Sequence, residues 1–149
     1  MKTLVAYYSR GGATRKAAEK LREITKGTLF EVRGEKNYGN YFSALRIAGK
    51  EFKTGELPKV MDNVENFNSY DRILIGFPIW YGKCPQLILS FAKQYDFSGK
   101  DVYPFCTSGM SGAEEAVKLL AESCKGAVMH SWIRMNNAGD EAVKNWLDK

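Results

Sequence analysis

The sequence has little proline, cysteine or histidine, and it has no long apolar run. Its 149 residues include 4 Pro, 3 Cys and one His, and 44% of them are hydrophobic and 26% charged. This composition is ordinary for a soluble globular chain and excludes the collagen-like, disordered and disulfide-scaffold classes. No apolar stretch approaches the ~20 residues of a membrane span, so we expect no membrane partner. The length predicts a single domain over residues 1–149.

The cysteines predict neither a disulfide framework nor a metal site. Cys84, Cys106 and Cys124 are odd in number, form no C-x-x-C motif and each stand in an apolar stretch. A single histidine adds too few ligands for zinc. We therefore expect small buried thiols in a reducing compartment. The apolar segment near the start is too short for a signal peptide, so the expected location is cytoplasmic.

The net charge of +5 is concentrated at the beginning of the chain. Seven basic and two acidic residues lie in residues 1–26, whereas the remaining residues carry 15 of each sign. Scattered basic residues would indicate little beyond solubility, but a local cluster directs a positive field at an anion. Exposed aromatic residues are not interleaved with this cluster, so we expect no nucleic-acid partner.

Short strand-like runs alternate with helical patterns along the chain. The expected strands and the helices that follow them cover residues 4–8, 17–24, 29–32, 41–52, 72–77, 87–95, 102–106, 116–124, 127–133 and 142–147. Strict alternation favours a parallel sheet with helices on both faces, which is a doubly wound α/β domain. Pro104 cannot donate a ladder hydrogen bond, so its strand is expected to be irregular or bulged. The polar stretch 53–69 is predicted to be a surface excursion.

Three loops that follow expected strands have unusual compositions. In an open α/β sheet, ligands bind beyond the carboxyl ends of the strands, so these loops supply the candidate site. The first loop consists of Ser9, Arg10, Gly11, Gly12, Ala13 and Thr14. Its glycines let backbone N–H groups converge, and the following helix adds roughly half a positive charge at its N-terminus. This loop predicts a phosphate-binding site, although it has neither the G-x-G-x-x-G nor the G-K-[ST] pattern.

The other two loops predict a flat ligand. The aromatic loop after the third strand contains Pro78, Ile79, Trp80, Tyr81 and Gly82, and the small-residue loop after the fourth contains Thr107, Ser108, Gly109 and Gly112. Adjacent aromatics on an exposed loop favour contact with a planar ring, although Trp80 alternatively serves as a core anchor of its loop. Together the loops provide an anion end, an aromatic wall and a polar edge, and flavin mononucleotide (FMN) fits all three.

Three motifs give the sequence a family resemblance. Three segments resemble the flavodoxins, in particular their compact bacterial branch: V-A-Y-Y-S-R-G-G-A-T, D-R-I-L-I-G-F-P-I-W-Y-G and P-F-C-T-S-G-M-S-G. The similarity extends over nearly the full chain. The resemblance implies a three-layer sandwich with a five-stranded parallel sheet in the order 2-1-3-4-5 and FMN at the point where strand order reverses. It also implies that the phosphate is held by Ser9, Gly12 and Thr14. The residues implied around the flavin ring are Trp80, Tyr81, Gly82, Ser108 and Gly109.

The chain departs from the flavodoxin pattern at several positions. The family usually has Ser or Thr where Gly11 stands and Asn where Ala13 stands, so two donors to the phosphate are absent. Each loss costs on the order of 1–3 kcal/mol unless backbone donors and the basic first helix replace it. Met110 stands near the place of a ring-stacking tyrosine that many members carry. Typical electron-carrier flavodoxins are strongly acidic, whereas this chain is basic.

The sequence favours an FMN-binding flavodoxin-like electron-transfer protein, with the flavin cycling between oxidised, semiquinone and hydroquinone states. Its partner would be a redox protein or a small-molecule electron acceptor, and the chain would be a monomer or weak dimer. One alternative is an NAD(P)H-dependent FMN or quinone reductase on the same fold. Another is a degenerate scaffold or partner-binding module without flavin. His130, on the fifth expected strand, is expected to be structural or exposed rather than catalytic.

The charge distribution leads to an expectation for the redox potential. An apolar site beside the phosphate disfavours the anionic hydroquinone, whereas a positive field stabilises it. We therefore expect the hydroquinone couple to be less negative than in acidic flavodoxins. Potentiometric titration measures it, and a couple as strongly negative as that of acidic carriers would contradict the expectation.

Overall fold

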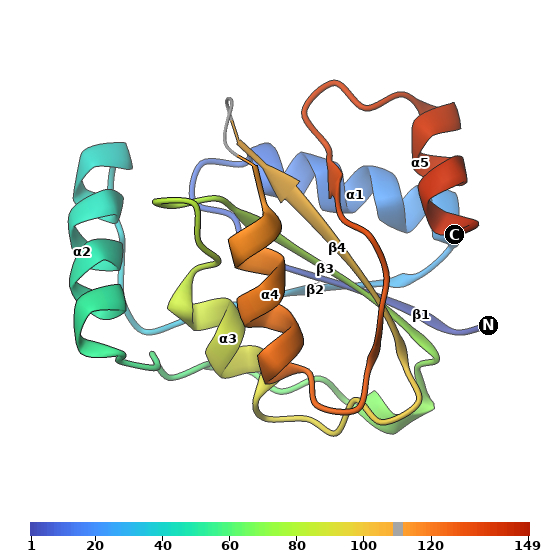
Figure 1. Ribbon diagram of the computed structural model, residues 1–149, viewed down its shortest axis with the longest axis horizontal. Coiled ribbons are helices and arrows are strands. Elements are labelled where there is room, and N and C mark those ends of the chain that lie inside the picture. Colours follow the sequence, from blue (N-terminus) through green and yellow to red (C-terminus); the bar gives the residue numbers. More distant parts are fainter. Residues whose placement is uncertain (109–111) are drawn as a thin grey trace.

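The computed structural model describes residues 1–108 and 112–149 (Figure 1). Its elements are, in chain order, β1 (Thr3–Tyr7), α1 (Ala13–Thr25), β2 (Thr28–Glu31), α2 (Tyr41–Thr54), a 3-10 turn η1 (Phe67–Ser69), β3 (Arg72–Pro78), α3 (Gln86–Ala92), β4 (Asp101–Thr107), α4 (Glu114–Ser123), β5 (Val128–Met129), β6 (Ile133–Arg134) and α5 (Asp140–Leu147). None of the helices in these described residues is long and apolar enough to cross a membrane.

The strands form one parallel sheet in the order β2-β1-β3-β4-β5, with β6 also beside β4. The predicted doubly wound α/β fold and its 2-1-3-4-5 order are therefore confirmed. The chain moves outward from β1 to β2 and then crosses back to β3 on the other side of β1. The loops that follow β1 and β3 consequently leave the sheet in different directions, and a crevice opens at its carboxyl edge.

Alternating residues of the central strands serve two separate cores. Leu4 and Ala6 of β1 belong to the core beneath α3 and α4, whereas Val5 and Tyr7 belong to the core beneath α1 and α5. All four side chains are almost fully buried because both faces of the sheet are covered. Figure 1 shows α1 and α5 on one side of the strands and α3 and α4 on the other. Cys84, Cys106 and Cys124 are buried free thiols, as predicted.

The fifth expected strand, residues 127–133, is divided into β5 and β6, which pair with the start and the end of β4. The carbonyl oxygens of Val102 and Cys106 accept hydrogen bonds from the side of β4 where β5 and β6 lie. Every second residue of a strand faces the same neighbouring strand, so Pro104, between these two, also faces β5 and β6. Pro104 has no N–H for the partner strand, and the pairing breaks there. The expected irregularity thus occurs in the partner, whereas β4 is continuous beside β3.

The stretch 53–69 is only in part the surface excursion that its polarity predicts. Val60, Val64 and Phe67 are buried in the core shared with α3 and α4. The ring of Phe67 stacks on Tyr95 with 4.3 Å between ring centroids, and the Tyr95 hydroxyl accepts a hydrogen bond from the Val64 N–H at 2.9 Å. The predicted surface excursion is therefore confirmed for most of the stretch, and its buried apolar side chains attach it to the core.

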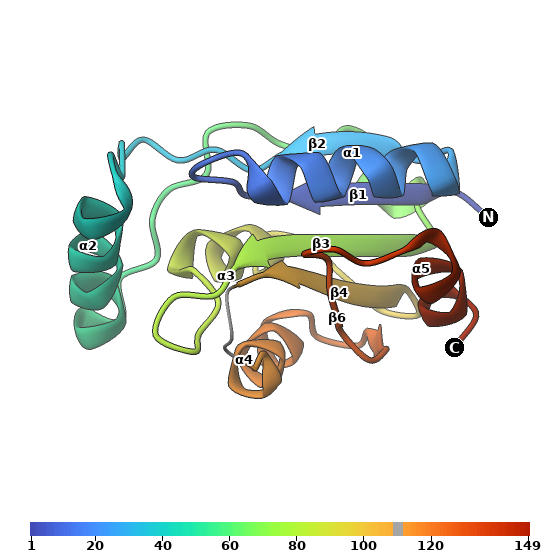
Figure 2. The same ribbon diagram turned by 90° about the horizontal axis from the view of Figure 1, so that it is seen from above.

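Helix α2 lies beyond the carboxyl ends of the strands rather than on a face of the sheet. Both Figure 1 and Figure 2 place it past the arrowheads, at one end of the molecule. Its inner side forms a small core of its own, in which Ala44 and Ala48 pack with Tyr38 and Trp80. The helix was expected from its apolar spacing, but its position brings it next to the candidate site.

The close packing of β3 and β4 at Gly76 can be tested by its effect on stability. Gly76 pairs with Phe105 across these strands, and a Cβ at Gly76 would overlap the buried Phe105 ring. Gly76→Ala is expected to lower the free energy of unfolding by about 1–3 kcal/mol because the core is overpacked. Urea denaturation measures the change, with Gly11→Ala as the control because a Cβ there meets nothing within 4 Å. Equal stability of the two variants would contradict the expectation.

Candidate functional site

A cavity of about 260 Å³ opens at the carboxyl edge of the sheet. Its lining residues are Ser9, Arg10, Gly11, Ala13, Thr14, Tyr41, Pro78, Ile79, Trp80, Thr107 and Ser108. They come from the loops after β1, β3 and β4, with Tyr41 added from α2. The structure therefore brings together residues of all three loops that the sequence singled out, and we call this space the carboxyl-edge cavity.

The β1–α1 loop presents the N-terminus of α1 to this cavity. Gly12 is the N-cap residue with φ of 103°, a left-handed conformation that glycine adopts without strain. No side chain caps α1, and its first turn contains no acidic residue. The Ser9 Oγ accepts a hydrogen bond from the Gly12 N–H at 3.0 Å, which closes the loop. The remaining first-turn N–H groups and the positive end of the helix dipole are suited to an anion.

A buried hydroxyl pair joins this loop to the end of β4. The Oγ1 atoms of Thr14 and Thr107 lie 2.7 Å apart, and either can be the donor. Each hydroxyl carries one proton, so the proton that is not used between them can be donated to a ligand. Next to the pair, the Ser108 N–H donates to the Asn136 Oδ1 at 2.9 Å, which fixes the beginning of the β4–α4 loop.

The indole of Trp80 is both a core anchor and part of the cavity wall. Only 2% of Trp80 is exposed, and its ring contacts the rings of Tyr8 and Tyr38 at centroid distances of 5.7 and 5.3 Å. The burial of Trp80 supports its interpretation as a core anchor, and its contact with a planar ligand stays a prediction. Burial raises the pKa of the Tyr8 phenol to about 12, so this group stays neutral near physiological pH.

Tyr81 and Gly82 do not line the carboxyl-edge cavity. They form a tight turn with φ of 54° and 72°, closed by two backbone hydrogen bonds between Trp80 and Lys83 of 3.0 and 2.8 Å. This turn directs Tyr81 to α2, where its hydroxyl donates to the Leu45 carbonyl at 3.0 Å. The structure therefore separates Tyr81 from Trp80, although the two are adjacent in sequence.

Three further glycines of the predicted site are not among the described lining residues of the carboxyl-edge cavity. Gly12 and Gly112 are not among the residues that line the cavity, although Gly12 shapes the loop that does. Gly109 lies outside the described residues.

Tyr41 is the lining residue that sequence reasoning missed. It is 52% exposed at the first position of α2, and the Arg10 guanidinium lies 5.8 Å from its ring centroid. Asn40 caps the helix by accepting a hydrogen bond from the Ser43 N–H. The only sequence signal was an aromatic pair directly after this cap, and such a signal does not reveal that the helix lies over the site.

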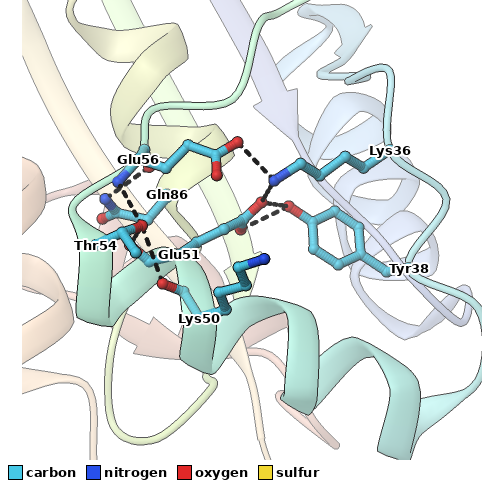
Figure 3. A network of polar contacts seen from close by, with 7 residues as sticks. All are labelled: Lys36, Tyr38, Lys50, Glu51, Thr54, Glu56 and Gln86. Carbon is cyan, nitrogen blue, oxygen red and sulfur yellow. Dashed lines mark hydrogen bonds and ion pairs between the residues drawn. The ribbon is translucent and has the colours of Figure 1, made fainter.

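A buried carboxylate holds α2 to the segment that precedes it (Figure 3). Glu51 is 1% exposed, and its two carboxylate oxygens accept hydrogen bonds from the Tyr38 hydroxyl at 2.8 and 2.9 Å. The Lys36 ammonium donates to Glu51 at 2.8 Å and to Glu56 at 2.6 Å. These bonds raise the pKa of Lys36, so its charge is retained. Because Tyr38 also contacts Trp80, the network supports the aromatic wall of the cavity.

The cavity is lined by hydroxyls, backbone, aromatic rings and one guanidinium, and none of its described lining residues is a histidine, cysteine or carboxylate. His130 lies elsewhere, stacked on Tyr103 with ring centroids 4.0 Å apart and its Nε2 2.8 Å from Asp101. Its structural role agrees with the expectation. The described lining residues can bind a planar anion, and they include no imidazole, thiol or carboxylate that could act as a general acid or base.

Comparisons with known proteins identify the family. A flavodoxin family model matches residues 2–149, and the chain therefore belongs to the flavodoxin family. A candidate flavoprotein from Bacteroides uniformis is 35% identical, with a TM-score of 0.84 over 99% of this chain and 98% of that one. A Lactobacillus acidophilus flavoprotein, solved in complex with FMN, is 30% identical, with a TM-score of 0.80 over 98% of each chain.

More distant similarity extends to flavodoxins proper. Oxidised flavodoxin 1 from Bacillus cereus is 15% identical, with a TM-score of 0.61 over 99% of this chain and 93% of that one, and it shares the fold alone. No curated protein matches the chain.

The buried network predicts unequal effects of two matched substitutions. Glu51→Gln removes the charge that faces Lys36 and Tyr38 and is expected to lower the free energy of unfolding by about 1–3 kcal/mol. Glu56→Gln removes the exposed partner of the same lysine and is expected to cost less than about 0.5 kcal/mol. Urea denaturation followed by tryptophan fluorescence measures both. Equal losses would show that burial of Glu51 does not matter.

Proposed function

We propose that this protein binds FMN in the carboxyl-edge cavity and acts as an electron-transfer protein. The observation that supports this most strongly is the pairing of two chemically different walls in one cavity. The uncapped N-terminus of α1 lies at one side, and the nearly buried Trp80 lies at the other. The Lactobacillus acidophilus relative, solved with FMN, covers nearly the whole chain and adds support.

The phosphate would be held at the β1–α1 loop. The first-turn N–H groups of α1, the shared hydroxyl proton of Thr14 and Thr107, and the nearby Arg10 form a donor set that suits a dianion. Gly11 and Ala13 lack the side-chain donors that the family pattern has, but both line the cavity. Backbone donors and the cationic first helix thus replace the missing side chains.

The isoalloxazine ring would lie against the aromatic wall. The Trp80 ring packs against the rings of Tyr8 and Tyr38, which hold it in one orientation. Binding of a ligand therefore costs little side-chain entropy at Trp80. Tyr41 lies at the edge of the same cavity and offers a second aromatic surface. The implied roles of Ser108 and Gly109 at the pyrimidine edge remain proposals, because Gly109 lies outside the described residues.

Bound FMN would supply reversible one- and two-electron redox chemistry. The described lining residues include no imidazole, thiol or carboxylate for proton transfer, and this favours a carrier over a reductase that must protonate a substrate. Steady-state oxidation of NADPH with a quinone acceptor distinguishes the two, and a carrier should show almost none.

The phosphate-binding role leads to a ligand-specific test. Thr14→Val keeps the shape of the side chain but removes the buried hydroxyl, so FMN is expected to bind about tenfold more weakly or worse. Riboflavin lacks the phosphate, and its affinity should change less than about twofold. Fluorescence titration of flavin-free protein measures both ligands.

Gly11→Ser is the matched gain-of-donor variant. A Cβ at Gly11 meets nothing within 4 Å, so a serine hydroxyl can enter the loop without a clash. This variant should bind FMN more tightly than the wild type and leave riboflavin unaffected. Wild-type protein that shows no preference for FMN over riboflavin, and no flavin absorbance as purified, would overturn the proposed function.

A further inference from the structure

The outward side of α2 is a basic surface with an exposed aromatic residue. We define the α2 face as Phe42, Arg46, Lys50 and Lys53, which lie on one side of the helix at spacings of three to four residues. Phe42 is 81% exposed and the three cations are exposed as well. The single acidic residue of α2, Glu51, is buried on the opposite side.

The cations of this face are not neutralised by neighbouring carboxylates. Among residues 1–108 and 112–149, no carboxylate lies within ion-pair distance of Arg46, Lys50 or Lys53. Arg10, at the adjoining loop, contacts the Tyr41 ring and likewise has no ion pair within these ranges. Exposed like charges repel one another, so their accumulation weakens stability and indicates a use in binding.

The α2 face adjoins the carboxyl-edge cavity. Tyr41 begins α2 and lines the cavity, while Tyr81, 58% exposed, lies against Gly49 of the same helix. Glu56, two residues beyond the end of α2, is ion-paired with Lys36. The acidic first turn of α4, with Glu114 and Glu115, lies well apart from α2 in Figures 1 and 2. A partner that binds the N-terminal end of the α2 face would therefore lie close to the part of the cavity that Tyr41 lines.

We propose that the α2 face is the docking site of an acidic redox protein that exchanges electrons with the cavity's ligand. This inference rests on the proposed function. Phe42 and Arg46 belong to the residue types that are enriched in protein interfaces, and Lys50 and Lys53 add a positive field that attracts an acidic surface. In each transfer the partner's centre loses one electron and the flavin gains one, and solvent supplies any proton that follows.

Stopped-flow kinetics with a probe of known charge tests the proposal. The FMN-loaded protein is mixed with reduced plant-type ferredoxin, an acidic iron–sulfur protein that donates one electron. The second-order rate constant is expected to fall at least tenfold between about 20 mM and about 500 mM NaCl, because salt screens opposite charges. A rate that is independent of salt, or that rises with it, would overturn the proposal.

Two charge-matched triple variants locate the effect. Arg46→Glu, Lys50→Glu and Lys53→Glu together should lower the rate constant at low salt at least tenfold. The control reverses Lys93, Lys125 and Lys144, exposed cations outside the cavity lining, and changes the net charge equally. The control should lower the rate less than threefold. Equal effects of the two triples would mean that overall charge, rather than the α2 face, attracts the partner.

Further measurements separate this proposal from the proposed function. FMN titration of each variant should give unchanged affinity, because none of the six positions lines the cavity. If the wild type binds no FMN, the proposed function fails, and docking is then followed by NMR shifts of the labelled chain on addition of ferredoxin. Shifts confined to α2 would support docking, and their absence would refute it. Tighter binding to DNA or anionic vesicles than to ferredoxin, lost in the α2 triple, would assign the face to another partner.

Discussion

The position of α2 depends on one buried carboxylate. Glu51 has no solvent to stabilise its charge, so its energy depends on the Tyr38 hydroxyl and the Lys36 ammonium, both within hydrogen-bond distance. These partners come from the segment between β2 and α2, which leaves the sheet at its carboxyl edge. The hydrogen bonds of Glu51 with Tyr38 and Lys36 therefore hold α2 across that edge instead of on a face of the sheet. The helix packs there on Trp80 through its small inner residues.

This placement links stability to binding. Trp80 is held between α2 and the body of the protein, so the wall of the carboxyl-edge cavity is set by packing before any ligand enters. The opposite wall is set by backbone, through the left-handed Gly12 and the uncapped start of α1. The hydroxyl pair of Thr14 and Thr107 joins the start of α1 to the end of β4. A rigid cavity of this kind limits the entropy lost when a ligand binds.

The sequence predicted the sheet and most of the cavity because both follow from short-range patterns. Apolar strands and helical spacing define the parallel sheet, and parallel strands bring the loops after β1, β3 and β4 to one edge. The location of α2 could not be predicted, since the apolar spacing of residues 41–52 is the same on a sheet face and beyond it. Glu51 looked like an ordinary charged residue of an exposed helix, and only its partners Lys36 and Tyr38, from the segment that precedes α2, explain its burial. The separation of Trp80 from Tyr81 likewise follows from a turn conformation that composition does not reveal.

A crystal structure of the FMN-loaded protein would show whether the carboxyl-edge cavity holds the flavin. We expect the phosphate at the first turn of α1 beside Thr14, the flavin ring against Trp80 with Tyr41 at its edge, and α2 still held by Glu51 beyond the strands. A structure in which α2 packs on a face of the sheet, or in which FMN binds away from Trp80, would contradict this expectation.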